Sequence, residues 1–67
     1  MNERQLITEL DYEAKYKLND TEHKKLERFE NKIGQWLLYN KDVVKSNGND
    51  PRKVARYIIS TYEYQKY

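Results

Sequence analysis

Few side chains of the types that carry catalysis or bind a metal are present, and they are scattered along the chain. There is no cysteine and a single histidine, His23, so a thiolate nucleophile is absent and a metal site has no second nitrogen or sulfur ligand. Ser46 and Ser60 lack the context of a catalytic nucleophile, there is no glycine-rich phosphate loop, and the carboxylates are not paired in an apolar setting. We therefore predict that the protein is not an enzyme and has no cofactor and no metal.

The distribution of charge suggests binding rather than catalysis. The net charge is +2, but the first 22 residues carry six acids and three bases, whereas the remainder carries five acids and ten bases. The later bases would suit a polyanion, and the alternative for each of them is an ordinary solvated helix face.

Length and composition restrict the fold class. With 67 residues, of which 36% are charged and 37% hydrophobic, we expect one mainly α domain over residues 1–67. A core this small is marginal, and no disulfide is available, so we expect a second copy of the chain to stabilise it as a homodimer. No apolar run approaches membrane-spanning length and no signal peptide is visible, which predicts a cytoplasmic protein without membrane contact.

Residues 13–18 decide between two folds. Apolar and charged residues alternate there with the period of two that is typical of a half-buried strand. The apolar side has Ala14, Tyr16 and Leu18, and the charged side has Glu13, Lys15 and Lys17.

The same segment also fits a helix that begins near residue 3. Leu6, Leu10, Ala14 and Leu18 repeat every four residues, and neither glycine nor proline interrupts the chain between Asn2 and Leu18. Both interpretations remain open from the sequence.

Two further helices are predicted downstream. Asn19-Asp20-Thr21-Glu22 offers oxygen acceptors for the free amides of a helix start, and a helix is expected over 20–45. Asp50-Pro51 is the clearest helix start in the chain, because Asp is a favoured cap and Pro fits the first helical position. The last helix is expected over 50–65. The expected apolar positions of the two helices are Leu26, Phe29 and Ile33 in the first, and Val54, Ala55, Ile58, Ile59 and Tyr62 in the second.

Strand, helix and helix in this order resemble the ribbon-helix-helix family of small phage and plasmid DNA-binding repressors. The resemblance rests on Lys15–Gly34 and Asn49–Tyr62, about half of the chain. Relative to that family, the chain has an insertion at Gln35–Gly48 and an acidic N-terminal extension at residues 1–12.

The resemblance implies a fold and a function. Two chains would pair their strands into an antiparallel ribbon within an intertwined homodimer, and the ribbon would enter the major groove of double-stranded DNA as part of a sequence-specific transcriptional regulator. Side chains on the ribbon would contact base edges, and the start of the last helix would contact phosphates. The implied residues are Glu13, Lys15 and Lys17 for the bases, and Arg52, Lys53 and Arg56 for the phosphates.

The alternative is an all-α three-helix bundle, with helices near 3–17, 21–45 and 51–65, that binds a host or phage protein. The apolar run Trp36, Leu37 and Leu38 would then be the partner-binding site, since aromatic residues dominate binding hot spots. Under this interpretation, affinity for duplex DNA would be weak, independent of sequence and steeply lost with salt.

Overall fold

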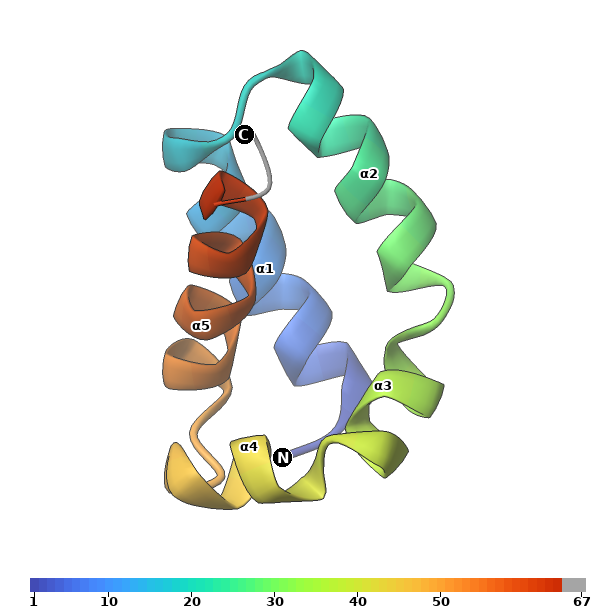
Figure 1. Ribbon diagram of the computed structural model, residues 1–67, viewed down its shortest axis with the longest axis vertical. Helices are drawn as coiled ribbons and strands as arrows, with labels where there is room; N and C mark the ends of the chain where they lie inside the picture. The colour runs from blue at the N-terminus through green and yellow to red at the C-terminus, as the bar shows by residue number, and fades with distance from the viewer. Residues whose placement is uncertain (65–67) are drawn as a thin grey trace.

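The computed structural model describes the backbone of residues 1–64 and the side chains of residues 1–61, and this part of the chain is helical without a strand. In Figure 1, α1 and α5 pack side by side, and α2 runs along the opposite edge of the molecule. The helices are α1 (Glu3–Lys17), α2 (Asp20–Glu30), α3 (Ile33–Tyr39), α4 (Lys41–Ser46) and α5 (Pro51–Tyr64).

The first helix, α1, begins with a reciprocal cap. Asn2 Oδ1 accepts a hydrogen bond from the backbone N–H of Gln5 at 2.9 Å, and Gln5 Oε1 accepts one from the backbone N–H of Asn2 at 3.1 Å. These two bonds satisfy amides that a helix start leaves without partners. Leu6, Leu10 and Ala14 are buried at intervals of four residues, so the helical period governs the segment as far as Lys17.

The strand expected over residues 13–18 is therefore wrong. Tyr16, which the alternation placed beside Ala14 on an apolar face, is 69% exposed. Without a strand there is no ribbon, and the resemblance to ribbon-helix-helix repressors is wrong with it. The mainly α class is confirmed, and the all-α alternative fits the helices better. The physical reason is that the four-residue repeat extends over three turns of α1, whereas the two-residue alternation is short.

The helix expected over 20–45 is three shorter helices. The first of them, α2, starts at Asp20 with a second reciprocal cap, between Asn19 and Glu22, and ends where the backbone leaves helical geometry at Lys32 (φ −114°, ψ 7°). The break between α3 and α4 lies at Asn40, whose backbone and side-chain N–H groups both donate to the carbonyl of Trp36 at 2.9 Å. Side-chain amides of this kind compete with helix propagation.

The last helix begins where the sequence places it. Asp50 Oδ1 accepts a hydrogen bond from the backbone N–H of Arg52 at 3.0 Å. Asp50, directly before Pro51, therefore caps the start of α5. The preceding turn reverses the chain through two residues with positive φ, Gly48 (69°) and Asn49 (56°), a conformation that glycine and asparagine adopt most readily. The side chain of Tyr62, and residue 65 at the expected helix end, lie outside the described residues.

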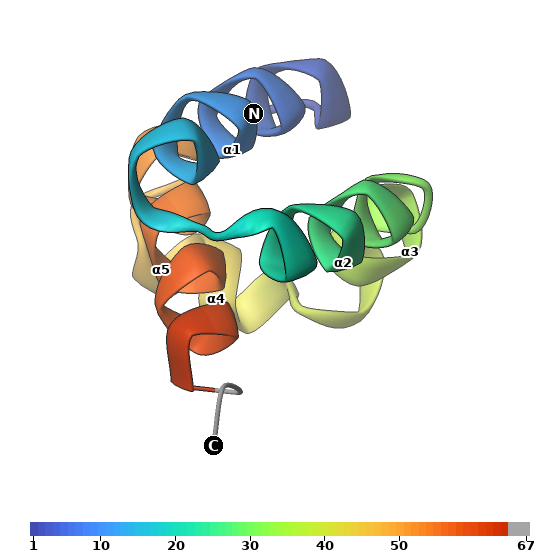
Figure 2. The same cartoon turned by 90° about the horizontal axis from the view of Figure 1, so that it is seen from above.

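The core lies between α1, α5 and the inner faces of α2 and α3. Seen from above (Figure 2), α1 lies beside α5 while α2 and α3 form the other side of the molecule. Ile7, Leu18, Phe29, Trp36, Leu37 and Val44 are partly buried against the core. Its buried members are Leu6, Leu10, Ala14, Leu26, Ile33, Val54, Ala55, Ile58 and Ile59.

Candidate functional site

The residues implied for base contacts all lie on α1 and do not share a face. Because successive residues of an α-helix are rotated by about 100°, Glu13 and Lys17 lie on one side and Lys15 on another. The Glu13 side chain is 12% exposed, with its carboxylate 3.4 Å from the Lys17 ammonium. The Lys15 ammonium instead lies 5.9 Å from the centre of the Tyr16 ring. The common face expected of a strand is not formed.

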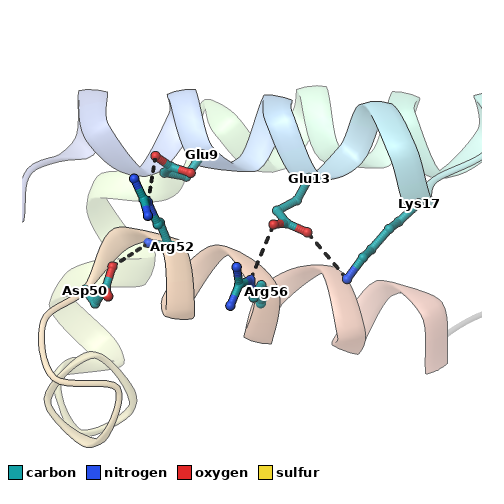
Figure 3. Close-up of polar contacts among 6 residues, drawn as sticks. All are labelled: Glu9, Glu13, Lys17, Asp50, Arg52 and Arg56. Carbon is teal, nitrogen blue, oxygen red and sulfur yellow. Dashed lines mark hydrogen bonds and ion pairs between the residues drawn. The ribbon is translucent and has the colours of Figure 1, made fainter.

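The residues implied for phosphate contacts differ in whether they are ion-paired. The Nε of Arg52 lies 4.0 Å from the Glu9 carboxylate, and the Nε of Arg56 lies 3.4 Å from that of Glu13. Figure 3 shows both pairs crossing from α5 to α1, with Lys17 on the other oxygen of Glu13. Lys53 is exposed and takes part in none of the ion pairs of residues 1–61. Glu9 of the N-terminal extension and Glu13 therefore compensate the two arginines.

This ion-pair ladder also sets the register of the two helices. Glu9 and Glu13 are one turn apart on α1, and Arg52 and Arg56 are one turn apart on α5, so α1 and α5 run in the same direction (Figure 3). A hollow of about 390 Å³ lies over the ladder, lined by two acids, two bases, Thr8 and Tyr12. Since its charges cancel, the hollow favours neither an anion nor a cation.

The apolar run of α3 is divided between the core and solvent. Trp36 is partly buried, with its ring edge-on to Phe29 at a centroid distance of 6.0 Å. Leu37 is partly buried as well, whereas Leu38 is 59% exposed and Tyr39 is 82% exposed. Of the three residues predicted to bind a partner, Leu38 is the most available to one.

A second hollow of about 400 Å³ lies where α3 and α4 meet the N-terminus of the chain. Its apolar lining comes from Met1, Leu37 and Val44, and its polar lining from Lys41, Lys45 and Asn49. We define the α3–α4 surface as this hollow together with Leu38 and Tyr39, which directly follow Leu37.

Two carboxyl groups meet between α1 and α2. Burial raises the pKa of Glu30 to about 7, and a hydrogen bond to Asp11 together with the negative charges of Asp11 and Glu27 adds to the effect. A hydrogen bond between two carboxyl groups needs a proton on one of them. The contact is therefore sensitive to pH near neutrality.

Sequence reasoning did not find the hollow or the carboxyl contact. Val44 and Lys45 were within a continuous expected helix, and only the break at Asn40 turns α4 so that both line the hollow beside Leu37. Asp11 and Glu30 are far apart in the sequence, and no local pattern signals their contact. Tyr39, the most exposed large side chain of the run, directly follows Trp36, Leu37 and Leu38, so its place in the sequence is a signal for including it with them.

Two classes of site find no support in residues 1–64. No group of three or more histidine, cysteine, aspartate or glutamate side chains in the described part of the chain is placed to hold a metal ion. None of the helices described there combines the length and the apolar character needed to cross a bilayer. Comparison of the chain with protein-family models, with curated proteins and with solved structures finds no match.

Proposed function

We propose that the protein is a small helical module that binds another protein through the α3–α4 surface. The observation that carries the proposal is the exposure of Leu38 (59%) and Tyr39 (82%), which directly follow Leu37 of the hollow's apolar lining in the chain. Single exposed apolar residues are ordinary, but neighbouring ones beside a concave apolar lining are typical of protein interaction sites. Tyrosine is also among the residues that contribute most to binding energy at interfaces.

The lining of the hollow indicates the chemistry of the partner. Apolar side chains would fill the space beside Leu37 and Val44, and carboxylates would approach the ammonium groups of Lys41 and Lys45. An amphipathic helix with an acidic border combines both features, and helices commonly dock into hydrophobic grooves in this way. The proposed partner therefore presents an acidic amphipathic segment.

Affinity capture with matched variants tests the proposal. The tag belongs at the C-terminus because Met1 lines the hollow. Protein from the source cell would be captured on the natural chain, on Leu38→Asp, and on Tyr16→Asp as a control. Tyr16 is 69% exposed, but on α1, so its variant introduces the same charge on another element.

We expect a partner that the natural chain and the Tyr16→Asp control retain and that Leu38→Asp loses. Burying a leucine side chain is worth about 1.5–3 kcal/mol, so affinity for the purified partner should fall by roughly 10- to 100-fold in Leu38→Asp. Equal capture by both variants would contradict the assignment to the α3–α4 surface.

The homodimer expected from the sequence stays a prediction, and sedimentation velocity measures it directly. A second copy of the chain is one protein that could occupy the α3–α4 surface. The proposal therefore predicts a specific interface for such a homodimer. A dimer that Leu38→Asp converts to a monomer would identify the partner as the chain itself. A dimer that survives the substitution would place self-association elsewhere.

A further inference from the structure

The exposed side of α2 carries a concentration of bases outside the α3–α4 surface. Lys24, Lys25 and Arg28 lie on α2 and Lys32 directly follows it, and all four are exposed. Lys24 and Arg28 are four residues apart and so lie on one side of α2, with Lys25 next to Lys24, and Lys32 lies in the turn that follows the helix. We name these four residues the α2 basic stripe.

No acid of the described residues is paired with the stripe. The ion pairs of residues 1–61 all lie on α1 and between α1 and α5, where they use Lys17, Arg52 and Arg56. Of the acids on α2, Glu22 is buried with its carboxylate bonded to the Asn19 amide, and Glu30 faces Asp11. Asp20, four residues before Lys24, and Glu27, directly before Arg28, are exposed, and neither forms an ion pair with the stripe in the described part of the chain.

The fold therefore separates compensated bases from uncompensated ones. Arg52 and Arg56, which the sequence suggested for phosphate binding, are held by Glu9 and Glu13. Arg28 and its neighbouring lysines form no ion pair in the described part of the chain, and α2, which carries three of these four bases, runs along the opposite edge of the molecule from α1 and α5 (Figure 1). At α2 a polyanion would meet bases without first displacing a carboxylate partner.

The spacing of the stripe matches a phosphate backbone. Four residues of α-helix rise by about 6 Å, and every second phosphate along one strand of duplex DNA is separated by about 7 Å of axis, so bases at successive helical turns can each meet a phosphate. An exposed helix edge can also lie against the wide major groove of B-form DNA, whereas the major groove of an RNA duplex is deep and narrow.

We propose that the α2 basic stripe binds the phosphate backbone of double-stranded DNA without reading its sequence. Lysine-rich phosphate contacts position a protein on the duplex but carry no sequence information. The stripe does not include any residue of the α3–α4 surface, so this inference is independent of the proposed protein-binding function. Together the two surfaces would bring a protein partner to DNA.

Fluorescence anisotropy with a labelled duplex of about 20 bp tests the proposal on the full chain. With three or four phosphates neutralised, affinity should fall by roughly 40- to 150-fold between about 50 and 200 mM salt. This measurement uses the natural protein and needs no variant. An affinity that is undetectable at the lower salt concentration, or unchanged by salt, would overturn the proposal.

Charge-matched variants locate the contact. Lys24→Glu/Arg28→Glu alters the stripe, and Lys15→Glu/Lys53→Glu makes the same change in net charge at two exposed lysines on α1 and α5. We expect the stripe variant to bind at least about tenfold more weakly than the control at low salt, since it removes two of the contacts and adds repulsion. Far-UV circular dichroism checks that both variants stay folded.

Two results would overturn the assignment. Equal losses in the stripe variant and the Lys15→Glu/Lys53→Glu control would show that binding follows net charge alone. An RNA duplex of the same length that binds as tightly as the DNA duplex would show that the partner is not specifically B-form DNA.

Discussion

The carboxyl contact between Asp11 and Glu30 makes the stability of the fold depend on pH near neutrality. The pKa of Glu30 is raised from 4.5 to about 7, because the folded chain partly buries the group and places it against Asp11. The folded state therefore holds a proton that the unfolded chain releases at a lower pH. This contribution to stability is complete below about pH 4.5 and is lost as the pH rises through about 7.

The size of the effect follows from linkage. Each tenfold change in proton affinity is worth about 1.4 kcal/mol, so the full shift would correspond to about 3 kcal/mol. Glu30 is only partly buried, and solvent screening reduces the electrostatic share of such a shift. We expect a loss of about 1 kcal/mol between about pH 5 and pH 8.

Glu30→Gln is the substitution that isolates this term. Glutamine stays neutral and its amide can still donate to Asp11, so the variant mimics the protonated glutamate. It should match the natural chain near pH 5 and exceed it by about 1 kcal/mol near pH 8, which is about 4–8 °C in Tm for a domain of this size.

Urea unfolding followed by far-UV circular dichroism across this pH range measures the difference. Taking the difference between variant and natural chain cancels the titration of all other groups. Asp42→Asn, at an exposed position on α4, controls for the loss of one negative charge. Parallel stability curves for Glu30→Gln and the natural chain would refute the linkage, as would the same pH-dependent gain in Asp42→Asn.

Two other substitutions test the packing around α1. Gly34→Ala should raise the free energy of unfolding by about 0.5–1 kcal/mol, because alanine is the better helix former. The added methyl group meets only the flexible end of the Glu3 side chain. A lower Tm in thermal unfolding would show that this side chain cannot move aside. Arg56→Gln should lower the free energy of unfolding in urea by less than about 1 kcal/mol. The Arg56 side chain is 61% exposed, and Glu13 keeps its ion pair with Lys17. A loss of several kcal/mol would mean that the ion-pair ladder contributes far more than a surface ion pair.

Helix starts and core positions could be recognised from local patterns. The Asn19–Glu22 and Asp50-Pro51 signals lie at the starts of α2 and α5, and the apolar positions Leu26 and Ile33 are buried. The Asn2–Gln5 cap carried the same kind of signal at the start of α1. This cap signal favours the four-residue repeat over the alternation in residues 13–18, because it starts a helix that contains them.

The candidate surfaces could be predicted less well, because they depend on how the helices end. The run from Trp36 to Leu38 could be singled out from the sequence as a candidate partner site, but the hollow requires the break at Asn40, where a side-chain amide competes for the Trp36 carbonyl. An asparagine alone does not specify a break, since the same residue also occurs within helices. The outcome depends on the packing of Leu37 and Val44 on either side of it.

The sequence by itself determined where α1, α2 and α5 begin and which side chains avoid water, because caps and apolar periodicity act over a few residues. Only the tertiary structure decided which charges are compensated. Glu13 and Arg56 are far apart in the chain, and their ion pair exists because α1 and α5 pack in parallel over a shared core. That packing pairs Arg52 and Arg56 with carboxylates, whereas the bases of the α2 basic stripe form no ion pair in the described part of the chain, since electrostatic partners are set by distance in space rather than by order along the chain.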